Sequence, residues 1–242
     1  MRRLTSASVL TAALSLSALP AMGQSFLEGL DAYFERDYST ALEHFKPLAQ
    51  KGNVPAQYRL AIMYDLGNGV TQDFHEAAHW HRRAAEQGHP PSQYELGNMY
   101  ENGEGLPQNH SKAVQWYRRA AEQEHGYAQH NLALMYANGE GVAQNYLTAA
   151  QWYRRAAAQG HDEAKINLGV MYADGLGEKK NLVLAYTYWI LAAAQGSEDA
   201  RNNRDIILKY LSREQINEGQ RLATEWQVGT PLPTHQDVTT WP

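Results

Sequence analysis

Two histidines and a glutamate form the motif that most directly suggests chemistry in this 242-residue chain. His75, Glu76 and His79 match H-E-x-x-H, which in zinc peptidases places two imidazoles on one helix face and leaves the glutamate as general base. Here Ala77 fits the small core position of the surrounding helical pattern, so the two histidines point outward. No dry cavity can then surround a metal. We therefore expect a solvated helix face, with catalytic or adventitious metal binding as the alternatives.

Other catalytic signatures are absent from the sequence. It contains no S-x-x-K, K-T-G or G-x-S-x-G motif, so the usual serine nucleophiles of hydrolases are missing. Glycine pairs such as Gly103 and Gly105 lack the third glycine and the Lys-Ser/Thr of a phosphate loop, and they are typical of turns. We therefore predict no catalytic residue and no cofactor.

Three arginine pairs recur along the chain, at Arg82-Arg83, Arg118-Arg119 and Arg154-Arg155. Such a ladder could bind an anionic polymer or partner. Arg82 and Arg118, however, each have a glutamate four residues on, which favours ordinary ion pairs on the helix surface. We interpret the arginines as a solvated face.

Residue types recur every 36 positions through the middle of the chain. The recurring positions hold a tyrosine, a leucine, a methionine and a pair of glycines: Tyr64, Tyr100, Tyr136 and Tyr172; Leu60, Leu96, Leu132 and Leu168; Met63, Met99, Met135 and Met171; Gly67/Gly69, Gly103/Gly105, Gly139/Gly141 and Gly175/Gly177. A fixed period of this size indicates a solenoid, because one unit alone cannot bury its apolar face. A solenoid offers a long binding surface rather than one catalytic pocket.

Each 36-residue unit has the pattern of two helices. In the second unit, Pro91 suits a first helical turn, and Leu96 and Tyr100 follow at helical spacing. Gly103 permits the positive φ that ends a helix. Asn109 can cap a second helix, whose expected buried residues are Ala113, Trp116, Tyr117, Ala120 and Ala121.

We expect an all-α fold, a right-handed α-solenoid in one domain. Its centre consists of four helix-turn-helix units at residues 53–88, 89–124, 125–160 and 161–196. A divergent helical pair at 24–52 precedes them, and capping helices at 197–226 follow, because terminal units of a solenoid face water on one side. Ser212 and Gln215 form a capping box that opens the last helix. The tail at 227–242 contains three prolines and no periodicity, so we expect it to be extended and disordered.

These units resemble the Sel-1-like repeat family, a longer-looped relative of the tetratricopeptide repeat. The first half matches A-x3-L-[AG]-x2-Y-x2-G-x-G and the second A-x2-W-[YH]-x2-A-A, as in Ala56, Leu60, Ala61, Tyr64, Gly67 and Gly69, and in Ala149, Trp152, Tyr153, Ala156 and Ala157. The resemblance covers 53–196 strongly and 26–52 weakly. It implies an α-solenoid used as a protein-interaction scaffold. Exported bacterial members are associated with envelope complexes, secretion, signalling and host contact.

The N-terminus is typical of a secretory signal peptide. Arg2 and Arg3 supply positive charge, residues 9–19 an apolar segment, and residues 21–23 a small-x-small cleavage site. The apolar segment is too short to span a membrane. We expect cleavage after Gly23 and a periplasmic or secreted protein with no membrane span. Removing the peptide changes the formal net charge from −5 to −7, which argues against nucleic acid as a partner.

Positions that vary between units mark a candidate binding surface, here called the first-helix stripe. It consists of Tyr58, Ile62 and Asp65; Tyr94, Asn98 and Glu101; His130, Leu134 and Ala137; and Ile166, Val170 and Ala173. By resemblance to tetratricopeptide folds, this stripe lines the concave surface. Apolar residues facing a groove suggest a peptide or helix bound along it. The alternative is that these residues pack against the next unit.

The sequence therefore predicts an exported, non-enzymatic scaffold or adaptor that binds a protein or peptide partner in the cell envelope. Two other classes stay open. One is a hydrolase, either active on the cell wall or a zinc metallopeptidase using His75, Glu76 and His79. The other is a periplasmic inhibitor or immunity protein that plugs the active site of a toxin. No pattern in the sequence identifies the partner, the pathway or the oligomeric state.

Overall fold

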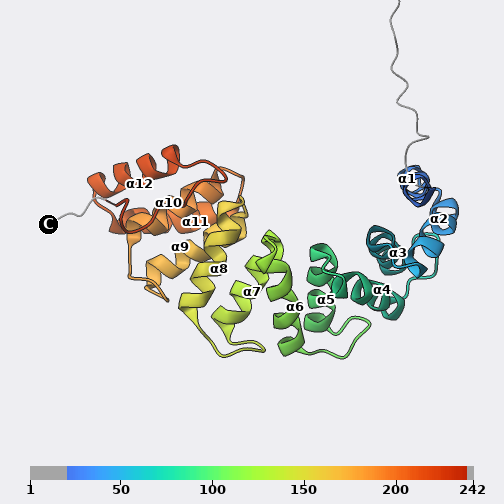
Figure 1. The fold of residues 1–242 in the computed structure, drawn as a ribbon. Helices are drawn as coiled ribbons and strands as arrows, with labels where there is room; N and C mark the ends of the chain where they lie inside the picture. Colours follow the sequence, from blue (N-terminus) through green and yellow to red (C-terminus); the bar gives the residue numbers. More distant parts are fainter. Residues whose placement is uncertain (1–20, 239–242) are drawn as a thin grey trace, which may run out of the picture.

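Helices follow one another along an arc in the computed structural model, which describes residues 21–238 (Figure 1). Within this range there are twelve α-helices and one short 3₁₀ helix, without a β-strand, so the all-α solenoid prediction is confirmed. Most of the expected signal peptide lies outside the described residues. Its last three positions begin the first helix. None of the described helices is both long and apolar enough to cross a lipid bilayer.

The helices form pairs that correspond to the sequence units. The pairs are α1 (Ala21–Phe34) with α2 (Tyr38–Gln50), α3 (Val54–Leu66) with α4 (Phe74–Glu86), α5 (Pro90–Asn102) with α6 (His110–Glu122), α7 (Gly126–Asn138) with α8 (Tyr146–Ala158), and α9 (Asp162–Asp174) with α10 (Leu182–Ala193). The chain then continues through α11 (Glu198–Ile207), η2 (Leu208–Tyr210) and α12 (Arg213–Glu225). The divergent N-terminal pair is therefore α1 and α2.

One sequence column begins the first helix of each unit. Asn53, His89 and His125 occupy it, and each side chain accepts a hydrogen bond from the backbone N–H three residues on. Gly103 ends α5 with a left-handed φ of 78°. At Gly105 a Cβ would lie 2.1 Å from the carbonyl oxygen of Phe74 in the preceding unit. The glycine pairs thus shape the turns and let neighbouring units approach.

The columns that repeat in sequence form the core. Leu96 and its equivalents in the other units are completely buried, as are Tyr117 and Tyr153. Trp116, which the sequence assigned to the buried face, is only partly buried. The guanidinium of Arg119 lies 4.5 Å from the centroid of its ring and covers it.

Buried glutamines join neighbouring units. Gln93 donates from Nε2 to the carbonyl oxygen of Ala85 (3.1 Å), and its Oε1 accepts a hydrogen bond from Gln123 (2.7 Å). Gln57 and Gln129 make the equivalent contacts in the adjacent units. Both ends of each buried amide therefore have partners, as a low-dielectric interior requires.

The arginine pairs also join units instead of forming a solvated ladder. Their first members donate to tyrosine hydroxyl oxygens eighteen residues on, Arg82 to Tyr100 (3.0 Å), Arg118 to Tyr136 (2.5 Å) and Arg154 to Tyr172 (2.8 Å). Their second members lie over tryptophans of their own helices. The expected ion pairs with glutamates one turn on are not formed in the part of the chain that the structure describes.

The C-terminal segment packs against the last helices, which corrects the expectation of a disordered tail at 227–242. Leu232 and Pro233 are buried, and Tyr188 on α10 donates from its hydroxyl to the carbonyl oxygen of Pro233 (2.7 Å). Residues 231–234 have no regular secondary structure and residues 235–237 form a turn, and the segment lies against α10, which α11 and α12 also contact. Residues 239–242 lie outside the described range.

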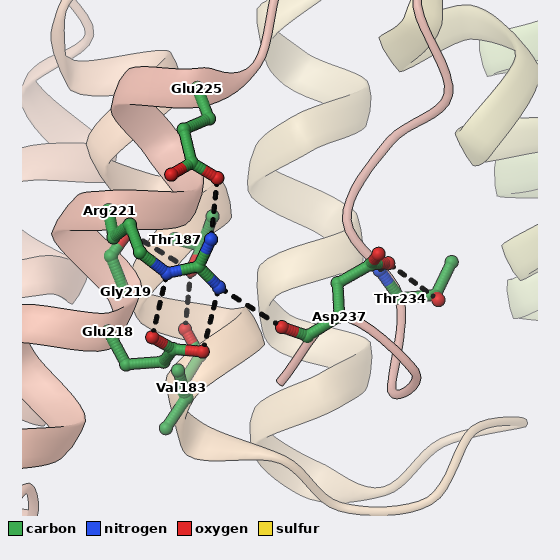
Figure 2. A network of polar contacts seen from close by, with 8 residues as sticks. All are labelled: Val183, Thr187, Glu218, Gly219, Arg221, Glu225, Thr234 and Asp237. Carbon is green, nitrogen blue, oxygen red and sulfur yellow. Dashed lines mark hydrogen bonds and ion pairs between the residues drawn. The ribbon is translucent and has the colours of Figure 1, made fainter. Parts of the chain in front are cut away.

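Arg221 on α12 links this segment to the final helix (Figure 2). Its guanidinium pairs with Glu218 (3.0 Å) and Glu225 (2.5 Å) and donates to the carbonyl oxygen of Asp237 (3.3 Å). Thr187 on α10 donates to the carbonyl oxygen of Val183 and contacts that of Gly219 on α12 (Figure 2). These contacts close the C-terminal end of the solenoid.

Candidate functional site

The H-E-x-x-H motif lies on the solvent side of α4. His75, Glu76 and His79 are all exposed, and Ala77 between them is buried, as the sequence pattern indicates. Among residues 21–238, no group of three or more His, Cys, Asp or Glu side chains is placed to hold a metal ion. The motif therefore has the geometry of an ordinary helix surface.

His81, two residues further on, is the histidine with unusual surroundings. It is buried, its ring lies 5.9 Å from that of Tyr58, and its Nδ1 has no hydrogen-bond partner among the described residues. Burial lowers the pKa of His81 to about 4, with a smaller contribution from His89. Its column contains Tyr117, Tyr153 and Trp189 in the following units, so His81 fills an aromatic core position. Sequence reasoning did not single it out.

The first-helix stripe is accessible along its whole length. All twelve of its residues are partly exposed or exposed, whereas the repeating positions beside them on the same helices are mostly buried. Leu134, 37% exposed, is the most open large apolar residue among them. The packing alternative applies in part to the stripe, because five of its residues also pack against the core: Tyr94, Ala137, Ile166, Val170 and Ala173.

An aromatic ladder adjoins the stripe. Tyr58 lies 4.8 Å from His89, Tyr94 lies 4.9 Å from His125, and Tyr127 lies 4.6 Å from His161, measured between ring centroids. Tyr127 is 61% exposed and was not among the predicted site residues. Its column holds proline in the two preceding units, a variation that could have identified it.

A hollow of about 310 Å³ opens beside this ladder, between α3, α5 and α7. We call it the aromatic hollow, and it is lined by Tyr58, Pro91, Tyr94, Glu95, His125 and Tyr127. Two predicted stripe residues, Tyr58 and Tyr94, thus form its walls. Glu95, which supplies its carboxylate, lies next to the stripe and was not predicted.

Polar residues connect the hollow to the rest of the stripe. The hydroxyl of Tyr117 lies 2.6 Å from Oδ1 of Asn98 and also contacts the carboxylate of Glu101. Asn98 donates from Nδ2 to Oε2 of Glu95 (3.0 Å). The predicted residues Asn98 and Glu101 are therefore held in fixed positions by the buried Tyr117.

Negative charge gathers along this part of the stripe. Burial raises the pKa of Glu95, and the nearby Asp65 raises it further. Burial likewise raises the pKa of Asp65, with a contribution from Glu104. Neither Asp65 nor Glu95 forms an ion pair with a basic residue of the described chain. The charged forms of both carboxylates are thus disfavoured in the free protein.

Two asparagines and a histidine form polar contacts between α7 and α9. Nδ2 of Asn167 lies 3.3 Å from Nε2 of His130, and Nδ1 of His130 lies 3.2 Å from Oδ1 of Asn131. Glu163 lies 3.9 Å from the same His130 ring. The predicted residue His130 therefore acts as a polar link between units at the centre of the stripe.

A second hollow, of about 410 Å³, lies where the C-terminal segment crosses the last units. Arg154 and Glu178 line it and pair with each other at 2.6 Å. His235 also lines it, with its ring 5.4 Å from that of Tyr172. Because the charges of this hollow neutralise one another, it is less suited than the aromatic hollow to a charged ligand.

Comparisons with known proteins agree with this architecture. The model of the Sel1 repeat family matches five consecutive segments, at residues 18–53, 54–89, 90–125, 126–161 and 162–197. The first segment includes the helical pair that the sequence indicated only weakly. Among curated proteins, none matches the chain.

Among the solved structures that are similar over most of the chain, two share about a third of their residues with it. One is c5321 of uropathogenic Escherichia coli, described as a protective antigen with an SLR fold. It is 31% identical, with a TM-score of 0.76, over 84% of this chain and 46% of c5321. The chain thus spans less than half of the length of that relative. The other is a Sel1 repeat protein from Oxalobacter formigenes, 33% identical, with a TM-score of 0.70, over 80% of this chain and 85% of that protein.

Proposed function

The chain belongs to the Sel1 repeat family, and from this premise we propose that it is an exported adaptor that binds a protein or peptide partner along its first-helix stripe. Sel1 repeats serve as protein-interaction scaffolds, and the adaptor role needs no catalytic residue in this chain. The proposal concerns a binding surface that spans several units, as is usual for solenoids.

One observation carries the proposal. The residues that repeat from unit to unit are mostly buried, whereas the residues that vary line an accessible stripe and an open hollow. Repetition is what packing between identical units requires, and variation at an accessible face is what a particular partner requires. Half-exposed tyrosines beside a hollow are typical of interface anchors, because their rings add much contact area with few rotatable bonds.

Export is part of the proposal. The charged start, the apolar segment and the small-x-small site at 21–23 support it. The similar E. coli protein is described as a protective antigen, a property that an extracytoplasmic location would suit. N-terminal sequencing of the protein recovered from separated cell fractions tests this part. A mature chain that starts at Gln24 in the periplasm or the medium is the expected result, and full-length protein in the cytoplasm alone would contradict it.

Site-specific photo-crosslinking tests the binding surface. A benzophenone amino acid replaces Leu134 on the stripe in one variant and Leu147 on α8 in the control. Leu134 is 37% exposed and Leu147 is 53% exposed, so the control position is the more accessible of the two and weaker crosslinking there would not reflect poorer access. We expect a discrete crosslinked protein from position 134 and not from position 147. Equal crosslinking from both positions, or none from position 134, would mean that the stripe is not the interface.

A further inference from the structure

The aromatic hollow has the features of a site for a positively charged side chain. Resting on the binding role proposed above, we propose that it receives an arginine or lysine side chain of the partner. Glu95 would pair with the cation, and Tyr58, Tyr94 and Tyr127 would surround its methylene groups and face its charge.

The walls of the hollow are held in place before any ligand arrives. The ring of Tyr94 is stacked on that of His125, inclined by 29°, and the ring of Tyr58 lies against that of His89. Tyr127 is the most accessible member, 61% exposed to solvent, and its ring lies 4.6 Å from that of His161. Tyrosine rings attract cations through their negative faces, most strongly where water is partly excluded. A preformed pocket also lowers the entropy cost of binding.

The carboxylate of Glu95 has no cation of its own. Its Oε2 accepts a hydrogen bond from Asn98 (3.0 Å), and in the described part of the chain no lysine or arginine lies within ion-pairing distance of it. Arg59, in the same column one unit earlier, places its guanidinium over the rings of Tyr33, Phe34 and Tyr58. A cation supplied by a partner would therefore meet an uncompensated carboxylate.

Neighbouring acids strengthen the same preference. Burial raises the pKa values of Glu95 and Asp65, and smaller contributions come from the repulsion of Glu95 by Asp65 and of Asp65 by Glu104, across α3, α5 and the loop after α5. Glu101 adds a further carboxylate on α5. A bound cation would relieve this repulsion, and its binding would be stronger at low salt. Neutral ligands would gain none of this energy.

A glycan is the ligand that most nearly competes, because tyrosine ladders also suit the faces of sugar rings. The structure favours a cation for one reason. The Glu95 carboxylate accepts a hydrogen bond from the Asn98 amide, and no basic side chain of the described chain lies within ion-pairing distance of it. An arginine or lysine would pair with this carboxylate, whereas a neutral sugar would not.

Titration with short capped peptides tests the inference. The probes are acetyl-Gly-Arg-Gly-amide and its citrulline analogue, which has nearly the same shape but no charge, with binding followed by NMR. For the wild-type protein we expect the arginine peptide to bind at least about tenfold more tightly than the citrulline peptide. Glu95→Gln should abolish that difference. Glu122→Gln, which removes an exposed acid from α6, is the matched control and should retain it.

Tyr127→Ala provides a second variant, and its exposed position makes misfolding of no concern. It should weaken the arginine peptide several-fold. Equal affinity for the two peptides, no saturable binding of either, or an unchanged preference in Glu95→Gln would overturn the inference. Saturable binding of a chito-oligosaccharide at these residues, without peptide binding, would instead identify a glycan site.

The outcomes also separate this inference from the proposed function. Crosslinking from position 134 combined with failure of the peptide test would mean that a partner binds the stripe without inserting a cation. Failure of both experiments would remove the adaptor role itself.

Discussion

The ring of Tyr94 is stacked on the ring of His125, with centroids 4.9 Å apart. Tyr94 belongs to α5 of one unit, and His125 is the residue that caps α7 of the next. One contact therefore serves two purposes, because it joins neighbouring units and fixes a wall of the aromatic hollow. Binding and stability are coupled at this position, and they can be separated by comparison with Tyr117, a fully buried tyrosine that does not line the hollow.

Tyr117→Ala should destabilise the protein far more than Tyr94→Ala. Tyr117 is completely buried, and removing a buried aromatic ring costs about 3–5 kcal/mol. Tyr94 is half-buried and contacts the rings of Tyr117, His125 and Tyr127, so its loss should cost about 1–2 kcal/mol. Urea unfolding of both variants measures the two costs. Similar losses would show that Tyr94 is a core residue and that the hollow is poorly placed for binding.

His81 should make the stability of the protein depend on pH. Its pKa is lowered from 6.5 to about 4 in the folded state, so the unfolded chain binds a proton at higher pH than the folded one does. The contribution of neutral His81 to the free energy of unfolding is therefore fully present above about pH 6.5. It is lost as the pH falls toward 4, by on the order of 2–3 kcal/mol. Thermal melts between these pH values measure the loss.

His81→Tyr is the matched variant for that measurement, because tyrosine occupies the same column in the next two units. It should reduce the acid sensitivity without weakening the protein at neutral pH. The residual sensitivity should come from His89, His125 and His161, whose pKa values are also lowered by burial. An unchanged pH profile in His81→Tyr would show that His81 is not the group responsible.

Much of the fold could be predicted from the sequence, because packing between identical units forces the same residues to recur. Leu96 and Tyr100 were identified in this way, and both are buried. Gln93 was missed although Gln57 and Gln129 share its column. A repeated polar residue is easily interpreted as surface, and only the structure shows that its amide spans two units.

The site could be predicted less completely than the fold. Variation between units identified Tyr58 and Tyr94, which are partly exposed and line the hollow, and their role in binding stays a prediction. It could not identify Glu95 or Tyr127, because their role depends on where three different helices meet. The tail was misjudged for a similar reason. Its prolines and lack of periodicity describe a backbone that forms no helix or strand in its described part, but not the face of α10 against which it lies.

Glu95→Gln should raise the thermal midpoint of the free protein at neutral pH. The pKa of Glu95 is raised in the folded state, which means that folding disfavours the charged carboxylate. The protonated side chain costs the folded protein nothing at a pH below the unfolded pKa, but the fold loses stability as the pH rises through the folded pKa and the carboxylate ionises. Glutamine keeps the shape and still accepts the hydrogen bond from Asn98. Melts at pH 7 and pH 4 should show the gain at pH 7 only. A lower midpoint at pH 7 would mean that Glu95 has a stabilising partner.

Removing the C-terminal segment should loosen the last unit and leave the others intact. Truncation after Gln227 deletes the carbonyl oxygen of Pro233 that accepts from Tyr188 (2.7 Å), and it uncovers the apolar surface beneath Leu232. An unpaired buried hydroxyl costs about 1–3 kcal/mol, to which the lost apolar burial adds. Because each unit contacts only its neighbours, the effect should decay along the solenoid. Hydrogen exchange should therefore speed up in α9, α10 and α12 while α3 to α6 stay protected.

Truncation after Val238, which keeps these contacts, is the control. Uniform acceleration along the chain would show that the solenoid unfolds as one unit, and no change would show that the segment contributes nothing to the end it covers.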